Sequence, residues 1–369
     1  DLLKDSHDDE DVRAENEQNA AEIAEAIRKK LETFGIEVTL DEQTIGPCYT
    51  LLSYNLDSKT PVAKISSVSG DLEMAARGGI RLLLPIPGTD KIGVEITNKR
   101  RSTIGVKEGI KTLSPVDENK LCFGFDIKRE AFRKSPDSLP NLLIGGTTGS
   151  GKSVFLHSLI MQIAYNYAPQ DIRLVLMDFK RVELAWYKKL PHLVKGEIID
   201  EPEKASEMIE KLTAEMSKRY RLLEENSVRN ISEYNELYPQ RKLPMILVII
   251  DEYADINQCD GAKLTESRIM QLMRKSRACG IHFVVATQRP SVEVIKGDIK
   301  ANIPSRIAMK VPSNIDSRNI LDASGAEKLS GKGDFLFSDG TVCRLQSPYV
   351  SPEEIKDVMK WIGENNKNE

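Results

Sequence analysis

Residues 146–153, GTTGSGKS, match the pattern G-x-x-x-x-G-K-[ST]. Glycines at these positions let the main chain curl so that successive amide groups point at phosphate oxygens. Lys152 is placed to reach the β and γ phosphates of a nucleotide, and the Ser153 hydroxyl to ligate Mg²⁺. The pattern predicts a site for ATP and Mg²⁺ whose nucleotide-binding residues are Gly146, Thr147, Thr148, Gly149, Ser150, Gly151, Lys152, Ser153 and Val154.

The sequence on either side of this loop favours a phosphate site over a glycine-rich turn without a ligand. Apolar residues 142–144 precede the loop, and the helix-compatible run SVFLHSLIMQIAYNY overlaps its end. The loop is therefore expected at a strand-to-helix turn, where the positive end of the helix faces the phosphates.

A pair of acids, Asp251 and Glu252, follows the apolar run MILVII. A strand that ends in two carboxylates near a phosphate loop supplies one acid to hold hydrated Mg²⁺ and another to polarise the attacking water. We assign the metal role to Asp251 and the water role to Glu252, and expect hydrolysis rather than simple nucleotide binding. The alternative is an acidic helix cap after a core strand.

Two further apolar runs end in polar residues that would meet at the same edge of a sheet. Gln288 follows GIHFVVAT and is suited to sense the γ-phosphate, although a polar turn before Pro290 would look the same. Asp178 follows RLVLM and either contacts the water shell of the metal or caps the run FKRVEL. We favour the structural role for Asp178.

Composition restricts the possible partners and chemistry. The chain of 369 residues carries a formal net charge of −4, and eight acidic side chains lie in its first twenty residues, so nucleic-acid binding would require a local basic surface. No apolar run approaches the ~20 residues of a membrane span, so we expect no membrane contact by this chain itself. The five cysteines lack CxxC spacing, which favours reduced thiols over disulfides or a zinc site.

The hydrophobic pattern changes along the chain and predicts three segments. Residues 1–18 are acidic, lack apolar periodicity and are expected to be a disordered tether. Residues 19–112 combine a helical pattern ended by Gly35 with short alternating runs, as in a small α+β domain. Residues 113–369 alternate continuously apolar runs with helical patterns, which predicts an α/β domain with a mainly parallel sheet covered by helices on both faces.

Long ordered blocks of the chain resemble the FtsK/SpoIIIE family of DNA translocases. The likeness covers about residues 20–360 and includes GGTTGSGKS, MDFKRVELAWYKKLPHL, VIIDEYADI, SRACGIHFVVATQRPSVEVIKGDIKANIPSRIAMKV and, in the smaller domain, IGPCYTLLSYNL. The resemblance implies a RecA-like P-loop ATPase that forms a homo-hexameric ring and pumps double-stranded DNA with the energy of ATP. It also implies a role in chromosome segregation at division or sporulation.

A ring implies that nucleotide lies at subunit boundaries and that a neighbour supplies a cation to the γ-phosphate. By the resemblance, Arg277 matches the position that we assign to this trans arginine, and the alternative is a solvated arginine at a helix C-terminus. The segment RPSVEVIKGDIKANIPSR resembles the DNA-contacting pore loop of the family, and the alternative is a solvated surface loop. The DNA-binding residues expected on this basis are Arg289, Lys296, Lys300, Arg306 and Arg318.

The chain departs from the family pattern at two places. Asn314 stands where relatives have a lysine, so no cationic contact is carried over to this position. The chain also ends at Glu369 without the winged-helix module that reads orienting sequences in many relatives. Relatives carry amino-terminal membrane spans, and a chain that begins at Asp1 is expected to be the cytoplasmic interior of a longer polypeptide.

Two other functions fit the same sequence. Secretion and conjugation ATPases share this motor architecture and move protein or single-stranded DNA. A nucleotide-gated scaffold would bind DNA without moving it. Stimulation of ATP hydrolysis by duplex DNA distinguishes the translocase from both.

Overall fold

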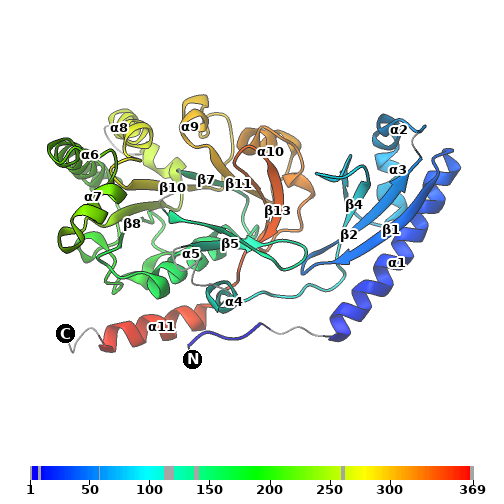
Figure 1. Cartoon of the computed structure of the whole chain (residues 1–369), viewed down its shortest axis with the longest axis horizontal. Helices are drawn as coiled ribbons and strands as arrows, with labels where there is room; N and C mark the ends of the chain where they lie inside the picture. Colours follow the sequence, from blue (N-terminus) through cyan, green and yellow to red (C-terminus); the bar gives the residue numbers. More distant parts are fainter. Residues whose placement is uncertain are drawn as a thin grey trace.

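Two domains, each with its own sheet, make up the computed structural model of the chain (Figure 1). The structure describes residues 2–6, 10–57, 59–111, 120–136, 141–258 and 262–365. No helix in these ranges is long and apolar enough to cross a membrane.

The small domain packs a long helix, α1, against a four-stranded antiparallel sheet of order β1-β2-β4-β3. Its core lies between them and contains Ala24, Ile27, Leu31, Leu52 and Tyr54. The elements are α1 (Glu10–Thr33), β1 (Val38–Ile45), β2 (Tyr49–Leu56), α2 (Val62–Ser67), α3 (Ser69–Ala75), β3 (Ile80–Leu83) and β4 (Ile92–Thr97).

The start of α1 corrects the expectation of a disordered segment over residues 1–18. The helix begins at Glu10, because Val12 and Asn16 extend its buried stripe by two turns. The apolar pattern fails there since Asn16 is polar: its amide donates to the Arg100 carbonyl (2.7 Å) and accepts from the Arg100 amide (3.2 Å). Further towards the N-terminus, Leu3 is buried in the core of the other domain.

The boundary between the domains lies earlier than the expected residue 112. Helix α4 (Val106–Lys111) packs into the large domain, where Val106 is fully buried in the core. Residues 98–105 therefore form the connection, and α4 belongs to the large domain.

The large domain is built on a nine-stranded sheet of order β6-β5-β13-β12-β11-β7-β10-β9-β8. The five strands from β11 to β8 are parallel, as expected, while β12, β13, β5 and β6 extend the sheet with antiparallel pairs. The strands are β5 (Leu121–Phe125), β6 (Ala131–Lys134), β7 (Leu142–Gly145), β8 (Ile172–Met177), β9 (Met245–Ile250), β10 (Ile281–Thr287), β11 (Ser305–Met309), β12 (Asp334–Ser338) and β13 (Val342–Gln346).

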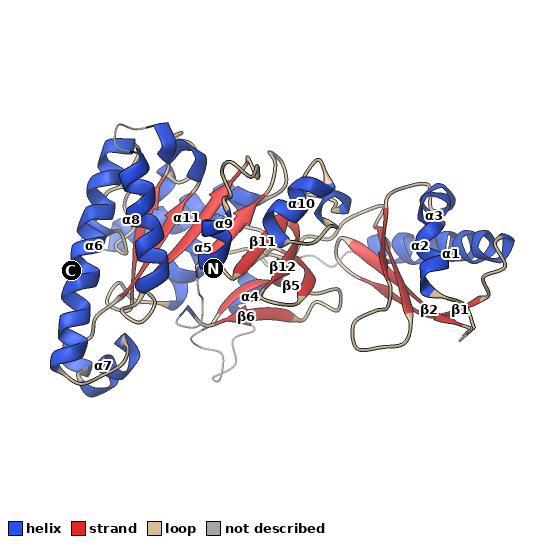
Figure 2. Ribbon diagram, turned by 90° about the horizontal axis from the view of Figure 1, so that it is seen from above, coloured by secondary structure: helices blue, strands red, loops and turns tan. Residues whose placement is uncertain are grey.

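Helices cover both faces of this sheet (Figure 2). Alternate residues of β9 divide between the two cores, Leu247 and Ile249 on the face of α5 and α11, Val248 and Ile250 on the face of α6 and α8. Burial on both sides explains why these strands read as continuous apolar runs. The helices are α5 (Lys152–Asn166), α6 (Pro202–Glu225), α7 (Ile231–Leu237), α8 (Ala262–Lys275), α9 (Gly297–Asn302), α10 (Asn314–Leu321) and α11 (Pro352–Asn365).

The parallel strands end together at one edge of the sheet, and four of them continue into residues with candidate chemistry. Strand β7 leads into the glycine-rich loop, β8 into Asp178, β9 into Asp251 and β10 into Gln288. The fold thus brings together residues that are up to 142 positions apart in the sequence, such as Gly146 and Gln288.

Candidate active site

At two positions of the loop of residues 146–151, the main chain has a positive φ, a conformation that favours glycine. Gly149 has φ +78° and Gly151 has φ +106°. At Gly151 a Cβ would also lie 2.2 Å from the amide nitrogen of Gly333, a contact that no side chain could make. The two glycines are therefore required by the curled main chain and by the loop packed against it.

The N-terminus of α5 supports the predicted phosphate site. Gly151 is its N-cap, and no side chain of the described residues caps the helix. The first amide groups of a helix have no partner within the helix, so they remain donors for an anion.

Lys152 and Asp251 form a buried ion pair. The Lys152 Nζ donates to the Asp251 Oδ1 (2.5 Å) and to the Asp251 carbonyl (2.7 Å). Both side chains are at most 3% exposed. Burial raises the pKa of Asp251, and the charge of Lys152 opposes this rise. Each group thus neutralises the other at the place where phosphate charge would enter.

Glu252 is held by the end of the neighbouring strand. The Thr287 hydroxyl donates to Glu252 Oε1 (2.6 Å), and the amide of Gln288 donates to Glu252 Oε2 (3.0 Å). The Lys180 ammonium lies 3.6 Å from the same carboxylate. Gln288 also accepts from the Thr148 hydroxyl (3.0 Å) and so connects the acids to the glycine-rich loop.

Asp178 and Glu183 add two carboxylates to this edge of the sheet. Asp178 is buried and accepts from the amide of Leu184 (2.8 Å), which matches the capping role, while its Oδ1 has no hydrogen-bond partner among the described residues. The His157 ring, whose Nε2 lies 3.7 Å from the carboxylate, lowers the pKa of Glu183, and Ser153 and the charge of Lys152 lower it further against the opposing effect of burial.

Motif reasoning did not identify Glu183 as a site residue. The only signal for Glu183 in the sequence is an acid a few residues after β8, a strand that ends at the same edge of the sheet as the P-loop strand β7. Glu183 lies near Ser153, the side chain that we assign to Mg²⁺.

The structure does not bring Arg277 to this site. Arg277 is exposed and precedes β10, so it lies at the opposite edge of the parallel strands from the glycine-rich loop. It borders a cavity of about 740 Å³ together with Arg229, Arg274 and Lys275.

The five residues expected to contact DNA differ in their surroundings. Lys296 is paired with Glu266 (2.7 Å), and Lys300 and Arg306 are both paired with Asp322. Arg289 and Arg318 are exposed and make no ion pair with any residue that the structure describes.

The chemistry of the site fits a Mg²⁺ ion that arrives with nucleotide. Within the described ranges, no group of three or more His, Cys, Asp or Glu residues could hold a metal ion. Ser153 and Asp251 would supply two oxygen ligands, and Mg²⁺ ordinarily takes its remaining ligands from phosphates and water.

A glycine-rich loop between β7 and α5, with acids on β9 and a polar residue on β10, defines the class of RecA-like P-loop ATPases. Solved structures share the fold at low sequence identity. The pCW3 conjugation coupling protein TcpA, solved with ATPgS, matches with a TM-score of 0.62 over 92% of this chain and 99% of its own, at 24% identity. EssC from Geobacillus thermodenitrificans matches with a TM-score of 0.61 over 68% of this chain and 50% of its own, at 21% identity.

The sequence then identifies the family. The model of the FtsK/SpoIIIE family matches residues 108–292, and that of the FtsK alpha domain matches residues 1–98. This chain belongs to the FtsK/SpoIIIE family, as the resemblance predicted.

Curated relatives bear the name DNA translocase FtsK. That of Clostridium acetobutylicum is 41% identical in an alignment of 351 positions that covers 92% of this chain and 46% of the relative. That of Staphylococcus aureus strain MRSA252 is 39% identical in an alignment of 368 positions that covers 94% of this chain and 46% of the relative. The chain spans about half the length of these relatives.

Proposed function

We propose that this chain is the motor of an ATP-driven translocase of double-stranded DNA that works as a homo-hexameric ring. The observation that carries the proposal is the P-loop with the Lys152–Asp251 pair and the anchored Glu252, in a chain about 40% identical to DNA translocases. The relatives favour a role in chromosome partition, carried out on the cytoplasmic side of the membrane.

Hydrolysis follows from the arrangement of the acids and the lysine. When ATP enters, the Lys152 ammonium would exchange the Asp251 carboxylate for phosphate oxygens. Ser153 and Asp251 would then hold Mg²⁺, which would supply positive charge to the phosphates. Glu252, fixed by Thr287 and the Gln288 amide, orients and polarises the attacking water, and the Gln288 side chain senses the γ-phosphate.

The position of Arg277 supports a ring. Because it lies at the edge of the sheet opposite to its own P-loop, it can serve only the nucleotide of another subunit. A head-to-tail contact that pairs these two edges closes into a ring if the rotation between subunits allows it. The exposed cations Arg289 and Arg318, with Lys296 and Lys300, would then grip phosphates without reading bases.

Two measurements test the proposal. Duplex DNA should stimulate ATP hydrolysis, and the protein should displace the third strand of a triplex in an ATP-dependent way. A purified chain that hydrolyses ATP at the same rate with and without duplex contradicts DNA translocation. Stimulation without triplex displacement contradicts movement along the duplex.

A motor for another cargo is the second candidate. Two solved structures share this fold: TcpA, which is described as a conjugation coupling protein, and a part of EssC that contains its ATPases 2 and 3. A protein pump should ignore duplex DNA in the hydrolysis assay, and a motor for single strands should respond to single-stranded but not duplex DNA. A nucleotide-gated scaffold should bind duplex without faster hydrolysis.

A further inference from the structure

The hydroxyl group of Tyr253 is buried and has no hydrogen-bond partner among the described residues. Tyr253 directly follows Glu252 and begins the short helix η5 (Tyr253–Gln258). The residue is only 2% exposed. An unpaired polar group at this depth costs about 1–3 kcal/mol. A state of the protein in which the hydroxyl finds an acceptor would therefore be favoured, and such a state would lie next to Glu252.

Helix α8 brings a carboxylate towards this hydroxyl. The helix packs against both η5 and α9 (Figure 1), and Glu266 lies in its second turn. Burial raises the pKa of the Tyr253 hydroxyl, and the negative charge of Glu266 raises it further. The hydroxyl therefore keeps its proton and is a donor without an acceptor, with a carboxylate close by.

The Glu266 carboxylate is occupied by Lys296. The Lys296 Nζ donates to Oε1 (2.7 Å) and to Oε2 (2.9 Å) of Glu266. Lys296 is the N-cap of α9 and belongs to residues 289–306, the segment that we expect to contact DNA. Its side chain is 50% exposed, whereas that of Glu266 is 17% exposed. A phosphate group that arrives from solvent can therefore draw Lys296 outward, while Glu266 stays within the protein.

Removal of Lys296 would leave Glu266 without a counter-ion, since it pairs with no other cation within the described part of the chain. A mostly buried carboxylate without a partner is costly, and the Tyr253 hydroxyl is a donor that needs an acceptor. We propose that Glu266 exchanges partners when DNA binds. It pairs with Lys296 in the free chain and accepts a hydrogen bond from Tyr253 once a phosphate of the duplex holds Lys296. The inference rests on the proposed binding of DNA by residues 289–306.

The exchange would connect the DNA segment to the residue that we assign to the attacking water. The amide of Asp255 donates to the Glu252 carbonyl (3.2 Å), so η5 is tied to Glu252. A hydrogen bond from Tyr253 to Glu266 would fix the start of η5 against α8 and so restrain the main chain of Glu252. Because the rate of a reaction depends steeply on the orientation of the reacting groups, this restraint would speed hydrolysis when duplex is bound.

The variant Lys296→Met tests the exchange in the absence of DNA. It frees Glu266 to accept from Tyr253, so the ATPase rate without duplex should rise roughly tenfold, about the effect of one hydrogen bond to a charged group. Addition of Tyr253→Phe to the same chain should return the rate to that of the parent. Tyr54→Phe is the matched control, because Tyr54 is also buried and its hydroxyl donates to the Ala24 carbonyl in the small domain (3.1 Å). A rate that does not rise in Lys296→Met, or a rise that Tyr253→Phe leaves intact, would overturn the proposal.

The variant Glu266→Gln separates the exchange from a general structural defect. It releases Lys296 to the duplex, so duplex should bind about threefold more tightly. The ratio of ATPase rates with and without duplex should fall, because a neutral amide accepts less strongly than a carboxylate. Glu210→Gln is the matched control, since it breaks the ion pair of Glu210 with Arg268 on α8 (3.3 Å). Weaker duplex binding with an unchanged ratio in Glu266→Gln would contradict the exchange.

The two proposals fail in different ways. A parent chain that hydrolyses ATP at the same rate with and without duplex contradicts DNA translocation, and the rate of Lys296→Met without DNA still decides whether Glu266 and Tyr253 act together. A parent chain that duplex stimulates, with no rise in Lys296→Met, retains the translocase and rejects the exchange. Absence of any ATP hydrolysis by the parent chain would reject both.

Discussion

The buried pair of Lys152 and Asp251 places two compensating charges inside the site. A lone charge at this depth would be costly, and each of these groups supplies the counter-ion of the other. On the proposed mechanism, nucleotide binding would be an exchange of partners, in which Lys152 gains phosphate oxygens as Asp251 gains the metal. Such an exchange would keep both buried charges compensated.

Substitutions at Lys152 and Glu252 should separate binding from hydrolysis. Lys152→Ala removes the cation for the phosphates and leaves Asp251 unpaired, so nucleotide turnover should be abolished. Glu252→Ala should retain ATP binding and lower the rate of hydrolysis by about 10²–10⁴, the usual contribution of a general base. Phosphate release and fluorescent-nucleotide binding measure the two effects. ATPase activity that persists in both purified variants would refute the site assignment.

The sequence predicted the residues of this site where a motif fixes their spacing. Lys152, Ser153, Asp251 and Glu252 are predicted in this way, and the structure brings Lys152 to Asp251, while their roles towards nucleotide stay predictions. Glu183 was missed because its approach to Ser153 depends on how the segment after β8 folds back over α5, which no local pattern specifies.

At the scale of elements, the P-loop depends on a loop almost two hundred residues away in the sequence. Residues 330–334 contribute two main-chain hydrogen bonds to it and leave no room for a side chain at Gly151. The P-loop is thus shaped from both sides, by its own glycines and by this distant loop.

Gly151→Ala should weaken ATP binding by more than an order of magnitude, because the new Cβ would displace the main chain of Gly333. Gly340→Ala is a matched control: Gly340 also has a positive φ, +117°, but no described atom lies within 4 Å of its Cβ position. Both variants carry backbone strain, and only the first has the clash. Equal ATP affinity of the two variants, measured by calorimetry, would show that the contact with Gly333 is unimportant.

The segment from the end of β10 into β11 contains exposed cations that could contact DNA and cations that are held by the protein itself. Substitutions should distinguish these two groups. Arg289→Ala should weaken duplex binding and reduce the slope of log K against log salt by about 1, as for one lost phosphate contact. Arg306 donates to the carbonyls of Ile303 (3.1 Å) and Lys300 (2.9 Å).

For that reason, Arg306→Ala should reduce the free energy of unfolding by about 2 kcal/mol. Filter binding over a salt series and denaturant unfolding measure the two effects. An unchanged salt slope in Arg289→Ala would exclude this arginine from the DNA interface.

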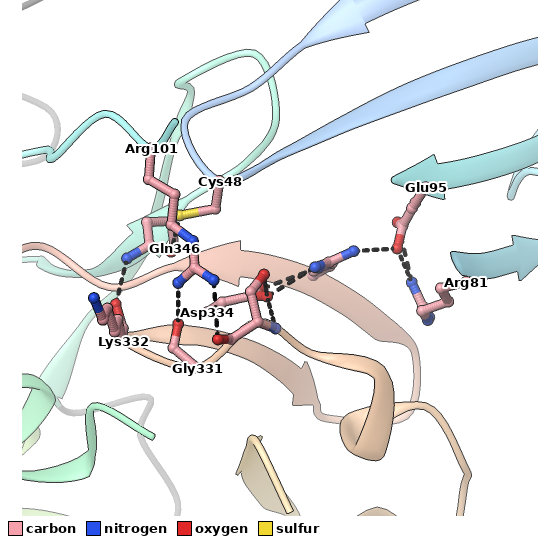
Figure 3. A network of polar contacts seen from close by, with 10 residues as sticks. Cys48, Arg81, Glu95, Arg101, Gly331, Lys332, Asp334 and Gln346 are labelled. Atoms are coloured by element: carbon pink, nitrogen blue, oxygen red, sulfur yellow. Dashed lines mark hydrogen bonds and ion pairs between the residues drawn. The ribbon is translucent and has the colours of Figure 1, made fainter. Parts of the chain in front are cut away.

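At the scale of the whole molecule, a buried chain of charges joins the domains (Figure 3). Arg344 on β13 binds Asp334 (2.7 Å) and reaches across to Glu95 of the small domain (2.7 Å). Glu95 in turn binds Arg81 (3.0 Å), and Arg344 lies over the ring of Tyr49. Burial alone would raise the pKa of Asp334, but the charge and hydrogen bonds of Arg344 hold it below the ordinary value.

Arg344→Gln should destabilise the protein by about 3 kcal/mol or more, because two buried carboxylates lose their shared counter-ion. Since the pKa of Asp334 is lowered in the folded chain, its contribution to stability is present above about pH 4 and is lost as pH falls below that value. In the variant, burial without the cation raises the pKa of Asp334, so this loss on acidification should disappear and the stability gap to the parent should narrow as pH falls. Denaturant unfolding between pH 3 and 7 measures both effects, with Arg28→Gln as an exposed control. Parallel pH profiles of the parent and the variant would contradict this account.

The architecture could be predicted from the sequence where burial on both faces produces continuous apolar runs, as in β8, β9 and β10. Strands β5 and β6 were not predicted, because β5 pairs with β13, far along the chain, and β6 pairs in turn with β5. The start of α1 was missed for a similar reason: Asn16 is satisfied by the connection after β4, which the local pattern cannot show.

The chain crosses between the domains twice. Leu3 and Ser6 lie against the large domain, where the Ser6 hydroxyl accepts from the amide of Gly105 (2.7 Å), and the chain returns through residues 98–105. The small domain is consequently tied to the large domain at two places in the chain, in addition to the buried pair of Arg344 and Glu95. Rotation of one domain against the other would have to break that pair, so we expect the two domains to transmit force as one unit.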